Sequence, residues 1–199
     1  MRSSKELPED YEKIYSVDLQ NDKKPALFVN LLAIVIAAVL IIPMLFLVPI
    51  KYMFDMEKGL VSYMIRFVVL MVSTVLYLVL HELVHGISMK LCGTKKVKYG
   101  FTGMYAFAGS DDYYGKSAYI FIALAPVVLW GIVLAIITPL VSKEWFWIVY
   151  FIQIMNISGA AGDFYVTFKF LRFPTDILVK DAGTSMMVFS KNRKGTNNA

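Results

Sequence analysis

Residues 60–90 of this chain read LVSYMIRFVVLMVSTVLYLVLHELVHGISMK, and this stretch decides the fold that can be expected. It is long and apolar enough to cross a hydrocarbon layer of about 30 Å, which needs about 20 helical residues. Its last third nevertheless carries His81, Glu82 and His85, which include both histidines of the chain. Because ionisable side chains inside a span are costly, their presence there favours a functional role.

Three further stretches are long enough to span a membrane, at residues 25–50, 117–141 and 145–170. The fraction of apolar residues, 58%, exceeds that of soluble domains. We therefore predict an all-α integral membrane protein with about four transmembrane helices. Residues 1–24 are polar and lack the pattern of a cleavable signal peptide, so the first span is expected to stay in the mature protein. The predicted four-span domain covers residues 25–172.

The positive charges are distributed unevenly between the two sides of such a membrane domain. Four spans place the N-terminus, the middle loop and the C-terminus on one side, which receives 16 of the 20 Lys and Arg residues, against three on the other. This asymmetry predicts a multi-pass protein of the cell membrane with both termini cytoplasmic. The net charge of +5 is thus explained by orientation and by contact with the lipid bilayer, and it does not indicate nucleic-acid binding.

Two segments outside the spans show the pattern of strands. Residues 97–107 alternate between aromatic or glycine positions and other residues, which indicates a short cytoplasmic hairpin or edge strand between the second and third spans. Residues 176–180 and 185–190 read as two short strands around a turn at 181–183. Surface loop is the alternative for both. Within 173–199, the polar tail from residue 191 onward is expected to be disordered.

The histidine motif has a geometric reason. Residues four apart share a helix face, so His81 and His85 can bind one metal ion while Glu82 reaches a water at that ion. The alternative is a pair of hydrogen-bonded core histidines beside a buried acid. Cys92 is the single cysteine, so a disulfide within the chain and a CxxC metal motif are both excluded. Further ligands must come from Asp or Glu.

A catalytic zinc site takes three protein ligands and leaves a position for water. Among nine Asp and six Glu, only Glu82 and Asp163 lie well inside the predicted spans. Asp163 is therefore the expected third ligand, and Glu82 is left as the general base. Depth agrees, because the histidines lie roughly 7 to 14 Å and Asp163 roughly 10 Å from the cytoplasmic ends of their spans. Packing of small residues, with Asp163 facing a water-filled crevice, is the alternative.

Three other polar residues need an interpretation. Asn156 lies about two turns from Asp163 along the last span, and it can bind a ligand or the substrate carbonyl, or simply join helices. Asp111 and Asp112 precede the third span, and we interpret them as solvated loop acids.

Several of these residues together resemble a known group. HELVHG on an apolar helix, a glycine-rich Tyr/Phe strand, Ala-Leu-Ala-Pro126, and Asn156 with Asp163 on the last span look like small bacterial membrane proteins described as "putative zincin peptidases". More distantly the chain is similar to site-2 proteases. That resemblance implies that His81, His85 and Asp163 hold Zn²⁺ and that Glu82 is the catalytic acid and base. The chain departs from the site-2 group in lacking a recognisable PDZ module and the Asn-Pro-Asp-Gly or Leu-Asp-Gly context around Asp163.

The predicted function is that of a zinc-dependent intramembrane peptidase, cleaving a membrane-protein or peptide substrate near the cytoplasmic side. The alternative is a non-catalytic membrane protein with a structural or sensory zinc site. A metal transporter would stagger polar groups across the bilayer, whereas here they cluster at one depth.

Overall fold

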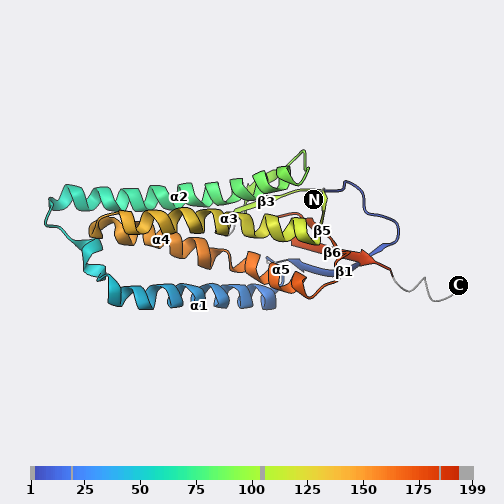
Figure 1. Cartoon of the computed structure of the whole chain (residues 1–199), viewed down its shortest axis with the longest axis horizontal. Helices are drawn as coiled ribbons and strands as arrows, with labels where there is room; N and C mark the ends of the chain where they lie inside the picture. The colour runs from blue at the N-terminus through green and yellow to red at the C-terminus, as the bar shows by residue number, and fades with distance from the viewer. Residues whose placement is uncertain (1–2, 19, 104–105, 184, 193–199) are drawn as a thin grey trace. The chain divides into compact units, whose positions relative to one another are not determined.

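The computed structural model describes residues 3–18, 20–103, 106–183 and 185–192. It is mostly helical, with small antiparallel sheets (Figure 1). In chain order the elements are β1 (Tyr11–Asp18), α1 (Lys23–Leu47), η1 (Ile50–Phe54), α2 (Gly59–Leu91), β2 (Lys98–Phe101), β3 (Ala106–Gly109), β4 (Tyr113–Gly115), α3 (Lys116–Ile137), η2 (Thr138–Leu140), α4 (Lys143–Gly159), α5 (Ala161–Leu171), β5 (Leu178–Asp181) and β6 (Ser185–Lys191).

The chain forms two compact units. The first, which we call the sheet unit, comprises Met1–Phe28, Glu82–Ala125 and Asp163–Ala199. The second, the helix unit, comprises Val29–His81 and Pro126–Gly162.

Four helical segments are long and apolar enough to cross a membrane, and each lies within a few residues of a predicted span. They run over Lys23–Leu47, Gly59–Leu91, Lys116–Leu140 and Lys143–Leu171. The fourth is divided into α4 and α5 at Ala160, within the run Ser158 to Gly162. Glycine and serine support a helix weakly, which explains a break at this position. As a consequence Asp163 lies in the first turn of α5.

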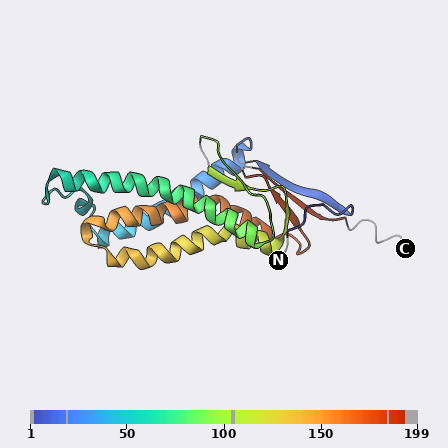
Figure 2. The same cartoon turned by 90° about the horizontal axis from the view of Figure 1, so that it is seen from above.

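The sheet unit contains a four-stranded antiparallel sheet in the order β1-β6-β5-β4. In Figure 2 the blue β1 and the red β6 lie side by side. The expectation of an all-α protein was therefore too narrow, and part of the polar segment 1–24 is a strand. Local sequence gave little sign of β1, because its pairing partner β6 lies about 170 residues further along the chain.

The predicted strands after the last span are confirmed as β5 and β6, joined at the expected turn. Gly183 adopts a φ of 102° there, a conformation that glycine tolerates best. The predicted segment 97–107 forms the antiparallel hairpin β2–β3, although its residues 104 and 105 lie outside the described residues. The tail was predicted to be disordered from residue 191, but Lys191 is the last residue of β6 and pairs with Tyr11. The rest of that prediction, from residue 193 onward, lies outside the described residues.

The core of the sheet unit holds the ends of two helices. Tyr114, Phe170, Val179 and Val188 have no exposed surface, and the buried Met89 of α2 and Ile122 of α3 belong to the same cluster. Burial of this kind stabilises by about 25 cal/mol per Å² of apolar surface. It fixes the last turns of α2 and the first turns of α3, where part of the candidate site lies.

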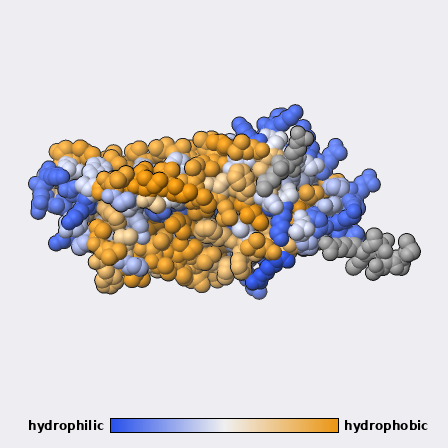
Figure 3. All heavy atoms as spheres, in the orientation of Figure 1, coloured by the Kyte–Doolittle hydropathy of each residue, from blue (hydrophilic) through white to orange (hydrophobic). Residues whose placement is uncertain are grey.

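In the helix unit, α4 joins its neighbours through aromatic side chains. Trp147 Nε1 donates to the Val48 carbonyl at 3.2 Å, and the Tyr150 hydroxyl donates to the Leu40 carbonyl at 2.9 Å. None of the residues of α1, all of which the structure describes, is buried. Figure 3 shows apolar side chains forming a broad orange surface over the helices. This surface has the composition expected of a lipid-facing one.

Candidate metal centre

Helix α2 presents the two histidines on one face, one turn apart. Its 33 residues run without interruption through the motif, so His81 and His85 have the spacing that two ligands of one ion require. Glu82 follows His81 directly and is half-buried. Both histidines and Glu82 therefore occupy the positions that the sequence predicted on this helix.

Asp163 comes close to the histidine pair. Within the sheet unit, its Oδ1 lies 3.7 Å from Nε2 of His85, with 23% and 12% of the two side chains exposed. One ligand atom from each of His81, His85 and Asp163 can be chosen such that all lie within 4.8 Å of one another. Zinc bonds of about 2.0 to 2.2 Å place tetrahedral ligand atoms about 3.3 to 3.5 Å apart. The cluster is thus slightly wider than a closed zinc site and has the donors for one.

The ring orientation of His81 follows from a chain of hydrogen bonds inside the helix unit. Asn156 Nδ2 donates to the Val127 carbonyl at 3.1 Å, which leaves its Oδ1 to accept from the Tyr77 hydroxyl at 2.9 Å. Having used its one proton, Tyr77 Oη must accept from Nδ1 of His81, 2.8 Å away. Nδ1 of His81 therefore carries a proton, and in the neutral imidazole Nε2 holds a lone pair for a metal ion.

His85 reaches the same state by a shorter route. Its Nδ1 lies 2.9 Å from the main-chain carbonyl oxygen of Ile122 in α3. A carbonyl can only accept, so Nδ1 carries a proton, and in the neutral imidazole Nε2, the atom near Asp163, holds the lone pair that a metal ion would use. Two imidazoles with Nδ1 protonated, together with a carboxylate, are the donors and supporting bonds typical of a zinc site. The residues fit zinc.

The sequence left open whether Asn156 binds a ligand or the substrate carbonyl, or joins helices. In the structure Asn156 does not face a substrate position. Its side chain is fully buried, and its amide joins α3 to Tyr77 of α2. It thus links helices and, through Tyr77, orients His81. Tyr77 itself was missed by the sequence analysis, although its position one turn before His81 on the same helix face was a usable signal.

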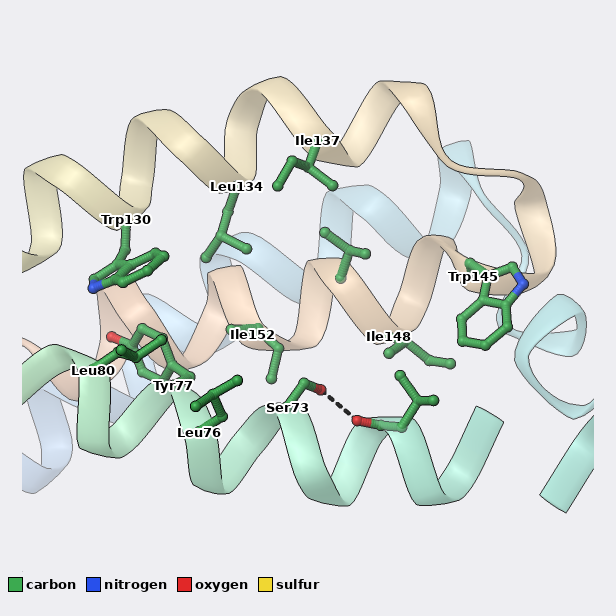
Figure 4. A pocket seen from close by; sticks show the side chains of 12 residues that line it. Ser73, Leu76, Tyr77, Leu80, Trp130, Leu134, Ile137, Trp145, Ile148 and Ile152 are labelled. Carbon is green, nitrogen blue, oxygen red and sulfur yellow. Dashed lines mark hydrogen bonds between the residues drawn. The ribbon is translucent and has the colours of Figure 1, made fainter. Parts of the chain in front are cut away.

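Tyr77 also lines an apolar pocket in the helix unit. The pocket has a volume of about 250 Å³ and lies between α2, α3 and α4 (Figure 4). Trp130, Leu134, Ile152 and Leu76 lie around it, and nearly all of its lining is apolar. An apolar cavity of about 150 Å³ takes a benzene ring. This pocket therefore has room for a large apolar group next to the residue that holds His81.

A second residue missed from the sequence is Asp181 of β5, in the sheet unit. Burial raises the pKa of its carboxyl from 3.8 to about 6, against the opposing effects of hydrogen bonds from Tyr119 and the Gly183 amide and of the charge of His85. The Asp163 charge raises it further. The sequence assigned this residue only to a turn, because its depth depends on how the sheet packs.

The two loop acids lie elsewhere. Asp111 forms an ion pair with Lys98 at 2.6 Å and is 70% exposed. Asp112 accepts a hydrogen bond from Ser3 Oγ at 3.2 Å. Among the described residues that could hold a metal ion, the cluster found consists of His81, His85 and Asp163.

The profile of a family described as "Putative zincin peptidase" matches residues 74–178, more than half of the chain. The chain belongs to this family. Membership in this zincin peptidase family confirms the resemblance, suggests a metallopeptidase and, through the family's name, implies zinc. The match begins just before Tyr77 and ends at the first residue of β5, so it includes the whole candidate cluster.

A curated relative gives a more distant comparison. The chain is 28% identical over 122 residues to a protein of Pyrococcus woesei named "Uncharacterized 24.7 kDa protein in gap 5'region". The match covers 59% of this chain and 53% of that protein, so the chain spans about half the length of this relative. No solved structure matches the chain.

Proposed function

We propose that this protein is a zinc-dependent intramembrane peptidase that hydrolyses a peptide bond near the cytoplasmic side of the membrane. The observation that carries the proposal is the cluster of His81, His85 and Asp163, each with a ligand atom within 4.8 Å of the others. Membership in the zincin peptidase family supports a peptidase. The hydrogen bonds at Nδ1 of both histidines support metal binding at their Nε2 atoms.

The chain's own residues then have distinct roles. When bound, zinc would act as a Lewis acid, lowering the pKa of water from about 16 toward about 7. His81, His85 and Asp163 would hold the ion. The Glu82 carboxylate accepts a proton from the attacking water and delivers it to the leaving amine. Glu82 is therefore the catalytic acid and base of the proposal.

The substrate must be extended at the cleaved bond, because a helix hides its carbonyl groups. The hairpin β2–β3 is a two-stranded sheet of the sheet unit, and its strand edges could hold an extended segment by main-chain hydrogen bonds. A membrane-protein or peptide segment is the substrate class that such an edge accepts.

Membrane insertion and orientation are part of the same proposal. Four helices of sufficient length and apolar composition support a multi-pass protein of the cell membrane. The 16 Lys and Arg on the side of both termini, against three on the other side, support a cytoplasmic location for the termini. Reporter fusions at each terminus test this, and an extracytoplasmic C-terminus would contradict it.

The test of function measures zinc and proteolysis together. The full chain is purified in detergent, its zinc is measured by elemental analysis, and cleavage of fluorescently labelled casein is followed. We expect about one zinc per chain, and Glu82→Gln should keep the zinc and lose cleavage. Glu57→Gln, which alters an exposed loop glutamate, is the matched control and should behave as wild type. Cleavage that survives in Glu82→Gln would overturn the mechanism.

The same experiment separates the alternative role. Stoichiometric zinc without any Glu82-dependent cleavage of casein or of apolar single-span peptides would favour a structural or sensory zinc site. Loss of zinc in His81→Ala and in Asp163→Ala is expected in either case.

A further inference from the structure

His85 contacts a carbonyl that most helices would not offer. In an α-helix the carbonyl of residue i accepts the amide hydrogen of residue i+4. For Ile122 that residue is Pro126, which lies inside α3 and has no amide hydrogen. The Ile122 oxygen is the one that lies 2.9 Å from Nδ1 of His85. The imidazole thus takes the place of the missing helical donor.

The replacement has a chemical consequence for His85. A main-chain carbonyl that lacks its i+4 amide donor keeps acceptor capacity for a side-chain N–H. The bond holds a proton on Nδ1, so that the neutral imidazole presents the lone pair of Nε2 on the side of Asp163. Pro126 is also fully buried, so its ring is packed and stays in place.

We propose that Pro126 is a positioning residue for the metal centre: by removing one helical donor it assigns the Ile122 carbonyl to His85, and so fixes Nε2 as the ligand atom. This inference rests on the proposed zinc site. It differs from a general role of proline in membrane helices, because it depends on one missing hydrogen and on one neighbouring histidine.

The experiment distinguishes the effect of the missing amide hydrogen at position 126 from the effect of the proline ring. Pro126→Ala restores an amide at position 126, whereas the α-hydroxy acid analogue of alanine at the same position gives an ester that has neither the ring nor the hydrogen. Pro43→Ala is the matched control, because Pro43 is likewise inside an apolar helix, α1. Zinc affinity of the full chain is measured for all four proteins by competition with a chelator of known affinity.

We expect Pro126→Ala to bind zinc about 10- to 100-fold more weakly, the usual effect of losing an outer-shell hydrogen bond. The ester variant and Pro43→Ala should stay near the wild-type affinity. Equal weakening in the ester and alanine variants would assign the effect to the ring and overturn the proposal. An unchanged affinity in Pro126→Ala would overturn it as well.

A second measurement does not depend on zinc. The chain has two histidines, so ¹⁵N-histidine labelling of the zinc-free protein gives two sets of imidazole signals, each from an Nδ1 and an Nε2 atom. Pro126→Ala should move the His85 signals away from the Nδ1–H tautomer and leave those of His81 in place, and His85 signals identical to wild type would refute the inference. If wild-type protein binds no zinc, the proposed function fails; if it binds zinc and Pro126→Ala changes neither affinity nor tautomer, only this inference fails.

Discussion

His81 and His85 lie one turn apart on the same helix, yet they are oriented by different kinds of partner. His81 contacts Tyr77, which contacts Asn156, so its support consists of side chains. His85 contacts the main chain at Ile122 directly. A side-chain partner can be lost through one substitution at its own position, whereas a main-chain carbonyl remains after most substitutions. Whether the carbonyl is available to a histidine then depends on whether the residue four positions later has an amide hydrogen to donate to it.

Both routes nevertheless end on α3. The Asn156 amide donates to the carbonyl of Val127, and His85 bonds to that of Ile122. The third predicted span thus contributes no ligand but supplies the main-chain acceptors that set both tautomers. This is a reason for the proposed metal centre to require α3 beyond simple packing.

The largest effect is expected from the ligand that neither route supports. Asp163→Ala removes the carboxylate from the first turn of α5, where the helix N-terminus also favours a negative charge. Losing a hydrogen-bond partner of a metal ligand weakens metal binding by up to about 100-fold. We expect the loss of the Asp163 ligand itself to weaken zinc binding by more than that. Chelator competition measures this, with Asp111→Ala as the exposed control. Wild-type affinity in Asp163→Ala would remove the residue from the site.

Tyr77→Phe tests the side-chain route to His81. The hydroxyl is the direct partner of Nδ1, so its loss should weaken zinc binding by about 10- to 100-fold. In zinc-free protein the ¹⁵N signals of His81 should move while those of His85 stay, the mirror image of Pro126→Ala. Tyr63→Phe, on the same helix, is the control. Equal movement of both histidines would show that the two supports are not separate.

Asn156→Ala should affect zinc less than Tyr77→Phe does, because the bond between Tyr77 and His81 remains. We expect less than about a tenfold change in affinity. The buried Val127 carbonyl and Tyr77 hydroxyl each lose their hydrogen bond to Asn156, so the free energy of unfolding in detergent should fall by about 1 to 3 kcal/mol. Gln153→Ala removes another α4 amide that bonds to α3, and it should reduce stability without changing zinc. A zinc loss larger than that of Tyr77→Phe would contradict this order.

The spans could be predicted from the sequence because their signal is local. A run of apolar residues and the i, i+4 spacing of His81 and His85 need no knowledge of distant contacts. The place of Asp163 in the candidate cluster could be predicted as well, because few acids lie inside spans and depth along a helix follows from counting residues. The break at Ala160 places Asp163 at the start of a helix instead of in the middle of one. The depth of Asp163 along the span, counted in residues, stays the same.

The residues that surround the ligands could not be predicted in the same way. Strand β1 depends on pairing with β6 at the other end of the chain, and the depth of Asp181 depends on the packed sheet. The proposed role of Pro126 has no local sign in the sequence, since its consequence appears only when His85 of another helix reaches the carbonyl four residues earlier. Supports of this kind are set by tertiary contacts, which single-residue patterns do not encode.

Asp181→Asn should change zinc affinity least, by less than about tenfold, because its carboxylate bonds to Tyr119 and to the Gly183 amide.

The main effect of Asp181→Asn concerns the pH dependence of stability. Burial raises the folded pKa from 3.8 to about 6, so between these values the folded protein binds the proton more tightly than the unfolded chain. The free energy of unfolding should therefore fall as pH rises from about 4 to about 6, by up to about 3 kcal/mol, and level off above. Thermal unfolding of zinc-free protein should show this fall in wild type and in the exposed control Asp10→Asn, and lose it in Asp181→Asn. A fall that persists in Asp181→Asn would place the buried proton on another group of the sheet unit.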